Sequence, residues 1–402
     1  MFQLSPAAVD LYKRLDDFMK TYVFPLEEKH LQKPYINHPD WTSWQTEPAI
    51  ELLKTKAKAA GLWNLFLPAL SGLNNLDYAS MAELMGHSLI ASEIFNCNAP
   101  DTGNMEVLHK YGTNDQKSTW LSPLLAGEIR SVFCMTEPAI ASSDPTNLQA
   151  TIAVDGDEII LNGRKWWGTG MGHPNCKLGI FMGLSDANAA KHQRHSMVIV
   201  PLDCPGVKIE RMLPVFGAYD QPYGHGEISF TNVRLPKSNI IAGLGKGFAI
   251  AQGRLGPGRI HHCMRLIGCA ERALKLMIER GLQRHAFGKP IIELGGNTDI
   301  IANARMQIDM ARLLVQKTAY LIDHYGIEKA YSEVAQIKVV VPQMACTIID
   351  QAIQMHGGAG LSNDTPLAAM YGYARILRLA DGPDEVHGNT VAKIEIKKYQ
   401  QL

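Results

Sequence analysis

Apolar residues recur at helical spacing through the first third of the chain. Ser5 and Pro6 suit the cap and first position of a helix. Apolar side chains then follow every few residues: Val9, Tyr12, Leu15, Phe18, Met19 and Tyr22. Similar patterns cover residues 51–60, 78–94 and 103–111. Together they predict a helical domain over residues 1–130.

Short apolar runs replace this pattern after residue 130. The runs at 151–154 and 159–161 are separated by Asp155-Gly156 and followed by Asn162-Gly163, dipeptides typical of tight turns between strands. Further strand patterns lie at residues 178–183, 196–200, 207–211 and 226–230. We therefore predict a small β domain over residues 131–243.

Long helical patterns return over residues 244–402 and indicate a helical bundle, which makes the chain α+β. Their apolar stripes comprise Ile260, Met264, Ile267, Leu274 and Met277, then Met306, Met310, Leu313, Leu314 and Leu321, then Val334, Ile337, Val341, Met344, Ile348, Ala352 and Met355. We interpret the methionines as core filling. Pro342 predicts a kink, and Gly357-Gly358 ends the third pattern.

The composition of the chain argues against several classes of function. The 402 residues carry a formal net charge of zero, which argues against a nucleic-acid partner held by bulk electrostatics. The seven cysteines form no Cys-x-x-Cys pair, which indicates a reducing compartment without structural zinc. No apolar run reaches the length of about 18 residues that spans a membrane. Acidic residues near the N-terminus fit no signal or transit peptide, so we expect a cytoplasmic protein.

One carboxylate stands at a predicted helix break near the C-terminus. Asp381 follows the apolar pair Leu379-Ala380 and precedes Gly382-Pro383, which stops a helix. A partly desolvated carboxylate beside exposed N–H groups would be a strong base next to an oxyanion site. On local sequence alone, a helix cap is the commoner role for such an Asp.

The other motifs are individually weak. The glycine-rich stretches match neither a dinucleotide-binding fingerprint nor a phosphate loop. His261-His262 lacks a third ligand at zinc spacing, so we expect no metal, and Arg259 is the better partner for an anion. The loop after Phe133 and the Trp166-Trp167 pair, which we place just after a strand, together offer stacking area and hydroxyl groups for a flat ring system.

In their order along nearly the whole chain, these motifs resemble the acyl-CoA dehydrogenase family. They are Thr136-Glu-Pro with Ser143-Asp, Lys165-x-Trp-x-Thr, Gly243-x-Gly-x-Gly-Phe, Arg284-His-Ala-Phe-Gly-Lys and Gln354-Met-His-Gly-Gly. The segments 252–265 and 379–387 are similar to the subgroup of family members 10 and 11, which in animals often carries a kinase-like domain that this sequence lacks.

The resemblance implies a helical domain, a β-barrel-like domain and a C-terminal four-helix bundle, with the reaction of a flavoprotein. An acyl-CoA thioester loses its α-proton to a carboxylate and its β-hydride to flavin N5 of FAD. Electrons pass on to an electron-transfer flavoprotein, and the protein is a homotetramer. Within this resemblance, Asp381 is the catalytic base.

Residue by residue, the resemblance also implies contacts to FAD and substrate. FAD contacts fall on Phe133, Met135, Thr136, Ser142, Ser143, Trp167, Gly168, Thr169, Arg284, Phe287, Gln354, Gly357, Gly358, Pro383 and Glu385. Arg284, Phe287, Gln354 and Gly358 would serve the FAD of a neighbouring subunit. Substrate contacts fall on Ser143, Gly258, Arg259 and His261.

Three departures from the family pattern leave alternatives open. The loop at residues 139–143 is one residue longer than usual, so either Ser142 or Ser143 could contact the diphosphate. The usual base is Glu, and Asp381 is shorter by one methylene. Gly258 occupies the position where some relatives place an alternative base. An oxygen-using relative, either an acyl-CoA oxidase or a nitroalkane oxidase, is an alternative, because nitroalkane oxidases resemble this family and also use Asp. A flavin-binding protein without turnover is another.

Overall fold

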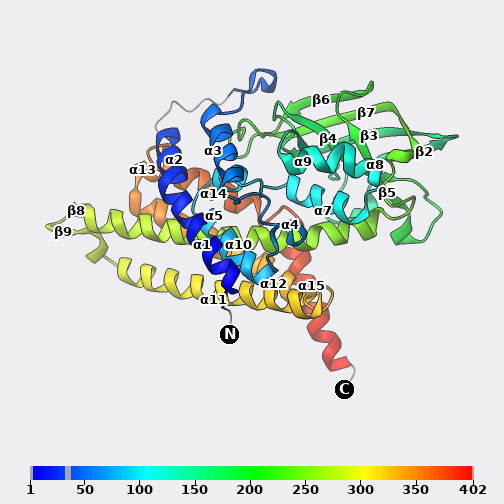
Figure 1. Cartoon of the computed structure of the whole chain (residues 1–402). Helices are drawn as coiled ribbons and strands as arrows, with labels where there is room; N and C mark the ends of the chain where they lie inside the picture. Colours follow the sequence, from blue (N-terminus) through cyan, green and yellow to red (C-terminus); the bar gives the residue numbers. More distant parts are fainter. Residues whose placement is uncertain (1–2, 32–37, 401–402) are drawn as a thin grey trace. The chain divides into compact units, whose positions relative to one another are not determined.

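The structure, a computed structural model, describes residues 3–31 and 38–400. The chain divides into two compact units, each considered by itself. The helical unit comprises Met1–Tyr35, Leu53–Phe95 and Gly258–Leu402, and the sheet unit comprises Ile36–Leu52 and Asn96–Pro257. The predicted α, β, α order of elements is confirmed (Figure 1). In the described residues, no helix is both long and apolar enough to cross a membrane.

The N-terminal helices follow the predicted pattern with two differences. The Ser5 hydroxyl accepts a hydrogen bond from the Ala8 N–H at 3.2 Å, which confirms the predicted cap. Leu15 and Phe18 of the expected stripe are buried, but Val9 is exposed, because the buried face instead includes Ala8 and Leu11. These helices are α1 Pro6–Phe18, α2 Phe24–Leu31, α3 Pro48–Ala59, α4 Pro68–Ser71, α5 Asn75–Gly86 and α6 Ala91–Ile94.

The single helix predicted over residues 78–94 is two helices, because the chain turns after Gly86. At this point α5 crosses α10 (Gly247–Gln283) at very close range. A Cβ at Gly86 would collide with the main chain of Arg265, and one at Gly268 would collide with the main chain of Glu83. Two glycines therefore permit a backbone approach that any side chain would prevent.

The C-terminal helices bury two of the three predicted stripes. The stripes on α10 and α12 are confirmed, and α12 continues through Pro342. The stripe on α11 is wrong as a core face, because Met306, Met310 and Leu313 are exposed. The helix instead buries a face that comprises Ala304, Ile308, Ala311, Val315, Thr318 and Ala319. The remaining elements are α11 Asn297–Tyr325, α12 Tyr331–His356, α13 Gly358–Leu361, α14 Leu367–Ile376, α15 Asp384–Gln400 and the hairpin strands β8 His285–Ala286 and β9 Lys289–Pro290.

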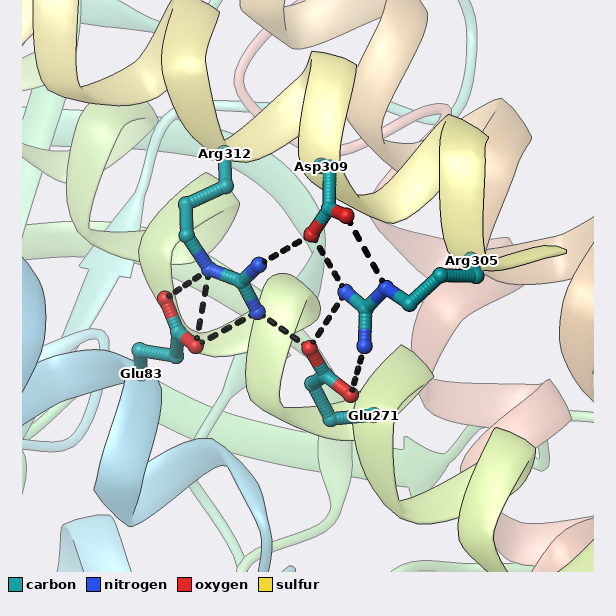
Figure 2. A network of polar contacts seen from close by, with 5 residues as sticks. All are labelled: Glu83, Glu271, Arg305, Asp309 and Arg312. Atoms are coloured by element: carbon teal, nitrogen blue, oxygen red, sulfur yellow. Dashed lines mark hydrogen bonds and ion pairs between the residues drawn. The ribbon is translucent and has the colours of Figure 1, made fainter.

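A network of charged side chains joins α5, α10 and α11 within the helical unit (Figure 2). Arg312 donates to both carboxylate oxygens of Glu83, at 2.9 and 3.1 Å, and also to Glu271. Arg305 donates to the two oxygens of Glu271 at 2.7 and 3.0 Å, and Asp309 accepts from both arginines. This bidentate pairing fixes three helices to one another.

The sheet unit is built around a curled seven-stranded sheet (Figure 1). The strand order is β1-β4-β2-β3-β7-β6, with β5 paired to β4, and β1 lies parallel to β4. The strands are β1 Arg130–Cys134, β2 Thr151–Asp155, β3 Glu158–Thr169, β4 Cys176–Leu184, β5 His195–Pro201, β6 Val207–Met212 and β7 His225–Pro236. The helices of this unit are α7 Asp101–Tyr111, α8 Asn114–Gln116 and α9 Ser122–Ala126. All six predicted strands are present.

Two features of the sheet differ from the prediction. The segment that begins at Arg130 is strand β1, although buried Arg130 and Ser131 broke the apolar pattern that marks a strand. The Trp166-Trp167 pair lies inside β3 rather than after it, at a shift in register between Lys165 and Gly168. This irregularity gives Trp167 a φ of 54° and leaves its indole exposed.

Candidate functional site

Asp381 lies in the turn that joins α14 to α15. The backbone of Asp381 is left-handed, with a φ of 58°, and α15 begins only at Asp384. A residue that caps a helix normally has an extended backbone and stands directly before the first helical residue. Both the conformation and the position of Asp381 therefore favour a role other than capping α15.

Buried donors fix this turn through its carbonyl groups. The carbonyl of Asp381 accepts from Arg259 Nε and from His387 Nε2, each at 3.1 Å. Lys338 Nζ, on α12, donates to the carbonyls of Leu377 at 2.5 Å and Ala380 at 2.8 Å. Burial lowers the pKa of His387 to about 4, so His387 donates as a neutral ring at pH 7. Donors from three helices thus hold the main chain on both sides of the carboxylate.

The carboxylate of Asp381 faces a histidine and a glycine of α10. Oδ2 lies 3.6 Å from His262 Nε2, and a Cβ built on Gly258 would lie 3.4 Å from the same oxygen. Gly258 and His262 are four residues apart and so share one face of the helix. The sequence analysis missed His262, although this spacing from Gly258 was a usable signal.

His261, which the sequence analysis assigned to the substrate, points into the protein. It is 2% exposed and packs edge-on against Tyr78, with ring centroids 4.8 Å apart. Burial lowers the pKa of His261 to about 3, so the ring is neutral. The Nε of Arg259 donates to the main-chain carbonyl of Asp381. Contacts of either residue with substrate stay predictions.

The residues predicted to contact the flavin ring form a second group, in the sheet unit. The main-chain N–H of Trp166 donates to the carbonyl of Thr136 at 3.0 Å. This hydrogen bond joins the segment after β1 to the irregular part of β3. The hydroxyl of Thr169 lies 3.0 Å from Nδ1 of His225, whose ring is 5.7 Å from that of Trp167. His225 is a further residue that the sequence analysis missed.

The two serines of the lengthened loop differ in their surroundings. The hydroxyl of Ser142 accepts from the Glu137 N–H at 2.9 Å, so it is engaged in shaping the loop. Ser143 is exposed. Glu137 itself is buried and accepts from Lys165 Nζ at 2.7 Å, which anchors the loop to β3. Of the two, Ser143 is the better placed to contact a ligand.

Two predicted residues lie at the end of β1, Phe133 within the strand and Met135 just after it. Phe133 carries the guanidinium of Arg254 over its ring at 3.9 Å, and Met135 accepts a hydrogen bond from Lys165 Nζ at 2.9 Å through its carbonyl. Gly168 is buried in β3.

The remaining predicted FAD residues belong to the helical unit. Phe287 is 95% exposed at the tip of the β8–β9 hairpin, where its φ is 50°, and Arg284 precedes this hairpin. Exposed positions also include Gln354, Gly357, Gly358 and Glu385, whereas Pro383 is half-buried in the Asp381 turn.

Comparisons with known proteins match the whole chain to the domains of one family. Successive parts of the chain match the descriptions "Acyl-CoA dehydrogenase, N-terminal domain" (residues 14–128), "middle domain" (132–233) and "C-terminal domain" (245–395). The chain is 53% identical to "Probable acyl-CoA dehydrogenase FadE2" of Mycobacterium tuberculosis, over 99% of this chain and 97% of that protein. It is 54% identical to mouse "Acyl-CoA dehydrogenase family member 10", over 99% of this chain but only 38% of that longer protein.

Solved structures are also similar to this chain in fold. A Mycobacterium abscessus structure described as an acyl-CoA dehydrogenase is 56% identical, with a TM-score of 0.95, over 99% of this chain and 100% of that one. A Mycobacterium smegmatis glutaryl-CoA dehydrogenase in complex with FADH2 is 22% identical, with a TM-score of 0.79, over 97% of this chain and 95% of that one, and shares the fold.

Proposed function

The chain belongs to the acyl-CoA dehydrogenase family, and we propose that it is an FAD-dependent acyl-CoA dehydrogenase in which Asp381 takes the α-proton of the thioester. One observation carries this proposal. The Asp381 carboxylate faces the side of α10 that Gly258 leaves open, on a turn held by buried donors to its carbonyls. A base must be held within reach of the proton it removes, and this turn is rigidly fixed.

The reaction requires more than a base, because the α-proton of a thioester is only weakly acidic. Bound acyl chain would exclude water from the Asp381 carboxylate and so make it more basic. The main-chain N–H of Asp381 would donate to the thioester oxygen as negative charge develops there. The left-handed backbone of Asp381 is compatible with this assignment, because it departs from the extended conformation that the N-cap of α15 would adopt.

The sheet unit offers groups that suit FAD. Trp167 presents an exposed indole for stacking, and Thr169 presents a hydroxyl beside it. Trp166 Nε1 is buried without a hydrogen-bond partner among the described residues, as expected beside a polar ligand. His225 Nε2 also makes no hydrogen bond there, but it lies 3.9 Å from Asp220 Oδ2. Thr136, Trp167 and Thr169 would hold the flavin ring, and Ser143 the diphosphate. FAD, when bound, supplies the hydride acceptor.

Assembly into a homotetramer is supported by two exposed features of the helical unit. The apolar stripe Met306, Met310 and Leu313 on α11 is exposed in the single chain. Phe287 holds an unfavourable left-handed backbone at a hairpin tip with its ring in solvent. Both features suit burial against another copy of the chain, where Phe287 and Arg284 would reach a neighbour's FAD.

The test begins with the purified protein, which we expect to be yellow and to release FAD on denaturation. Anaerobic mixing with acyl-CoAs of varied length should bleach the flavin with at least one of them. Transfer of the electrons to an electron-transfer flavoprotein, with slow reoxidation in air, would identify a dehydrogenase. Rapid reoxidation by air would identify an oxidase, and bound FAD that no acyl-CoA reduces would contradict the proposal.

A further inference from the structure

His262 lies between an arginine and the carboxylate of Asp381. Its Nδ1 is 3.0 Å from Arg265 Nη2, and its Nε2 is 3.6 Å from Asp381 Oδ2. His262 and Arg265 are both buried, on consecutive turns of α10. The Arg265 Nε also lies 3.3 Å from the hydroxyl of Tyr373 on α14, and the main chain of Arg265 is held against Gly86 at the helix crossing. Arg265 is thus a fixed group.

This geometry determines which nitrogen of His262 carries the proton. A guanidinium has only donors, so Nδ1 must accept from Arg265. The single proton of a neutral imidazole then resides on Nε2, the nitrogen that faces Asp381. A second proton could enter only at Nδ1, which the guanidinium occupies. His262 can therefore donate toward the carboxylate but cannot accept the proton that the carboxylate acquires.

We propose that His262, held by Arg265, is a positioning residue that keeps the Asp381 carboxylate ionised and directed along the face of α10 before it takes the substrate α-proton. This inference rests on the proposed function, because it presupposes that Asp381 is the base. At 3.6 Å the contact is longer than a hydrogen bond, so a small rotation of the Asp381 side chain would complete it while the main chain of the turn stays in place. A hydrogen bond to the ionised form of a carboxyl group lowers its pKa.

Other titratable groups also interact electrostatically with Asp381, namely Arg259 and Cys263 on α10, Lys338 on α12 and His387 on α15, whereas His261 points away toward Tyr78. Arg259 and Lys338 donate to carbonyls of the turn. Burial raises the pKa of Cys263 to about 12, and His261 and His387 are neutral at pH 7. His262 differs from them because its Nε2 faces the carboxylate itself, 3.6 Å from Oδ2.

The test measures proton removal without hydride transfer. An acyl-CoA with sulfur at the β-position can lose its α-proton but cannot lose a β-hydride. Incubated with the FAD-loaded enzyme in deuterated water, it should acquire deuterium at the α-carbon, which mass spectrometry counts. The rate of exchange is measured from acidic to alkaline pH. The exchange rate falls on the acidic side of this profile, its acid limb, and the pH of that fall reports the pKa of the base.

Three variants separate the donor from the shape of the ring. His262→Phe keeps a ring but has no donor, and His262→Asn is polar but too short to reach the carboxylate. Both should move the acid limb upward by about one pH unit and slow exchange about tenfold below it, while the alkaline plateau changes little. His262→Gln can accept from Arg265 and donate to Asp381 at once, so its limb should stay near that of the wild type.

Each outcome has a distinct meaning. An equal loss of exchange at every pH, without movement of the limb, would show a merely structural role and overturn the inference. An acid limb that stays at the wild-type pH in both His262→Phe and His262→Asn would also overturn the inference. Asp381→Asn distinguishes this failure from that of the proposed function. If Asp381→Asn exchanges as fast as the wild type, Asp381 is not the base and the proposed function itself fails.

Discussion

Arginine and lysine act differently in the two charged clusters of the helical unit. In the network of Figure 2, Arg312 and Arg305 donate directly to carboxylates, and each carboxylate is paired with arginine. Around Asp381, by contrast, Arg259 and Lys338 donate to main-chain carbonyls, and the carboxylate faces the ring of His262. Bidentate pairing with arginine stabilises the ionised form of a carboxylate and occupies both of its oxygens, so such a carboxylate is not available to a substrate proton. The first arrangement fits three helices together, and the second fixes a turn while its carboxylate remains able to take a proton.

The largest effect that separates the two clusters is expected from Lys338→Met. Met has similar length but cannot donate to the carbonyls of Leu377 and Ala380, so the turn that carries Asp381 should shift. Small misplacements of a catalytic group cost about 10²-fold in rate, and we expect a loss of that order in flavin reduction. Stopped-flow absorbance measures it, with FAD content as the control. A rate within twofold of the wild type would show that the turn holds its shape without Lys338.

Arg312→Ala should have the opposite profile, with lost stability and an unchanged rate per bound flavin. Burial raises the pKa of Glu83, and removal of Arg312 would leave this carboxylate without its bidentate partner. We expect the free energy of unfolding to fall by about 3 kcal/mol. Urea titration measures this change.

The matched control in the same network is Arg305→Ala. Arg305 is 41% exposed in its side chain, so its removal should cost only about 1 kcal/mol. If Arg312→Ala were no more destabilising than Arg305→Ala, the network of Figure 2 would not be what holds these helices together.

A further effect concerns acid sensitivity and comes from His261. Burial lowers its pKa to about 3 in the folded protein, against about 6.5 when unfolded. Protonation therefore favours the unfolded state, and stability present above pH 6.5 is lost as pH falls toward 3. By pH 5 the loss from this residue should be on the order of 2 kcal/mol. His261→Phe should remove this part of the pH dependence in urea titrations at pH 7 and pH 5. An identical dependence in both proteins would refute it.

Much of the fold could be predicted because apolar periodicity reports which faces must be covered. The α12 stripe is buried within the chain, as predicted. The α11 stripe failed as a core face because periodicity cannot tell whether the same chain or another copy covers Met306 and Met310. Strand β1 was missed because its buried polar residues Arg130 and Ser131 are satisfied by distant partners, which no local pattern shows.

The candidate site could be predicted only in part. Asp381 was singled out because Gly382-Pro383 marks a break in the helical pattern, but only the resemblance to the family made it the base, and that role stays a prediction. Adjacent histidines on a helix point in directions about 100° apart, and the sequence does not say which one faces a site. Only the structure shows His261 against Tyr78 and His262 beside Asp381. The donors Lys338 and His387 also stayed hidden, because their acceptors are carbonyl groups far away in the sequence.

The most direct test of the account is the rate of anaerobic flavin reduction in Asp381→Asn. The substitution preserves shape and the main-chain N–H but removes the group that takes the α-proton. With an acyl-CoA that reduces the wild type, we expect stopped-flow absorbance to show a loss of about 10⁴-fold, at unchanged FAD content and acyl-CoA binding. A rate within about tenfold of the wild type, equivalent to about 1.4 kcal/mol of barrier, would contradict the assignment of Asp381 as the base.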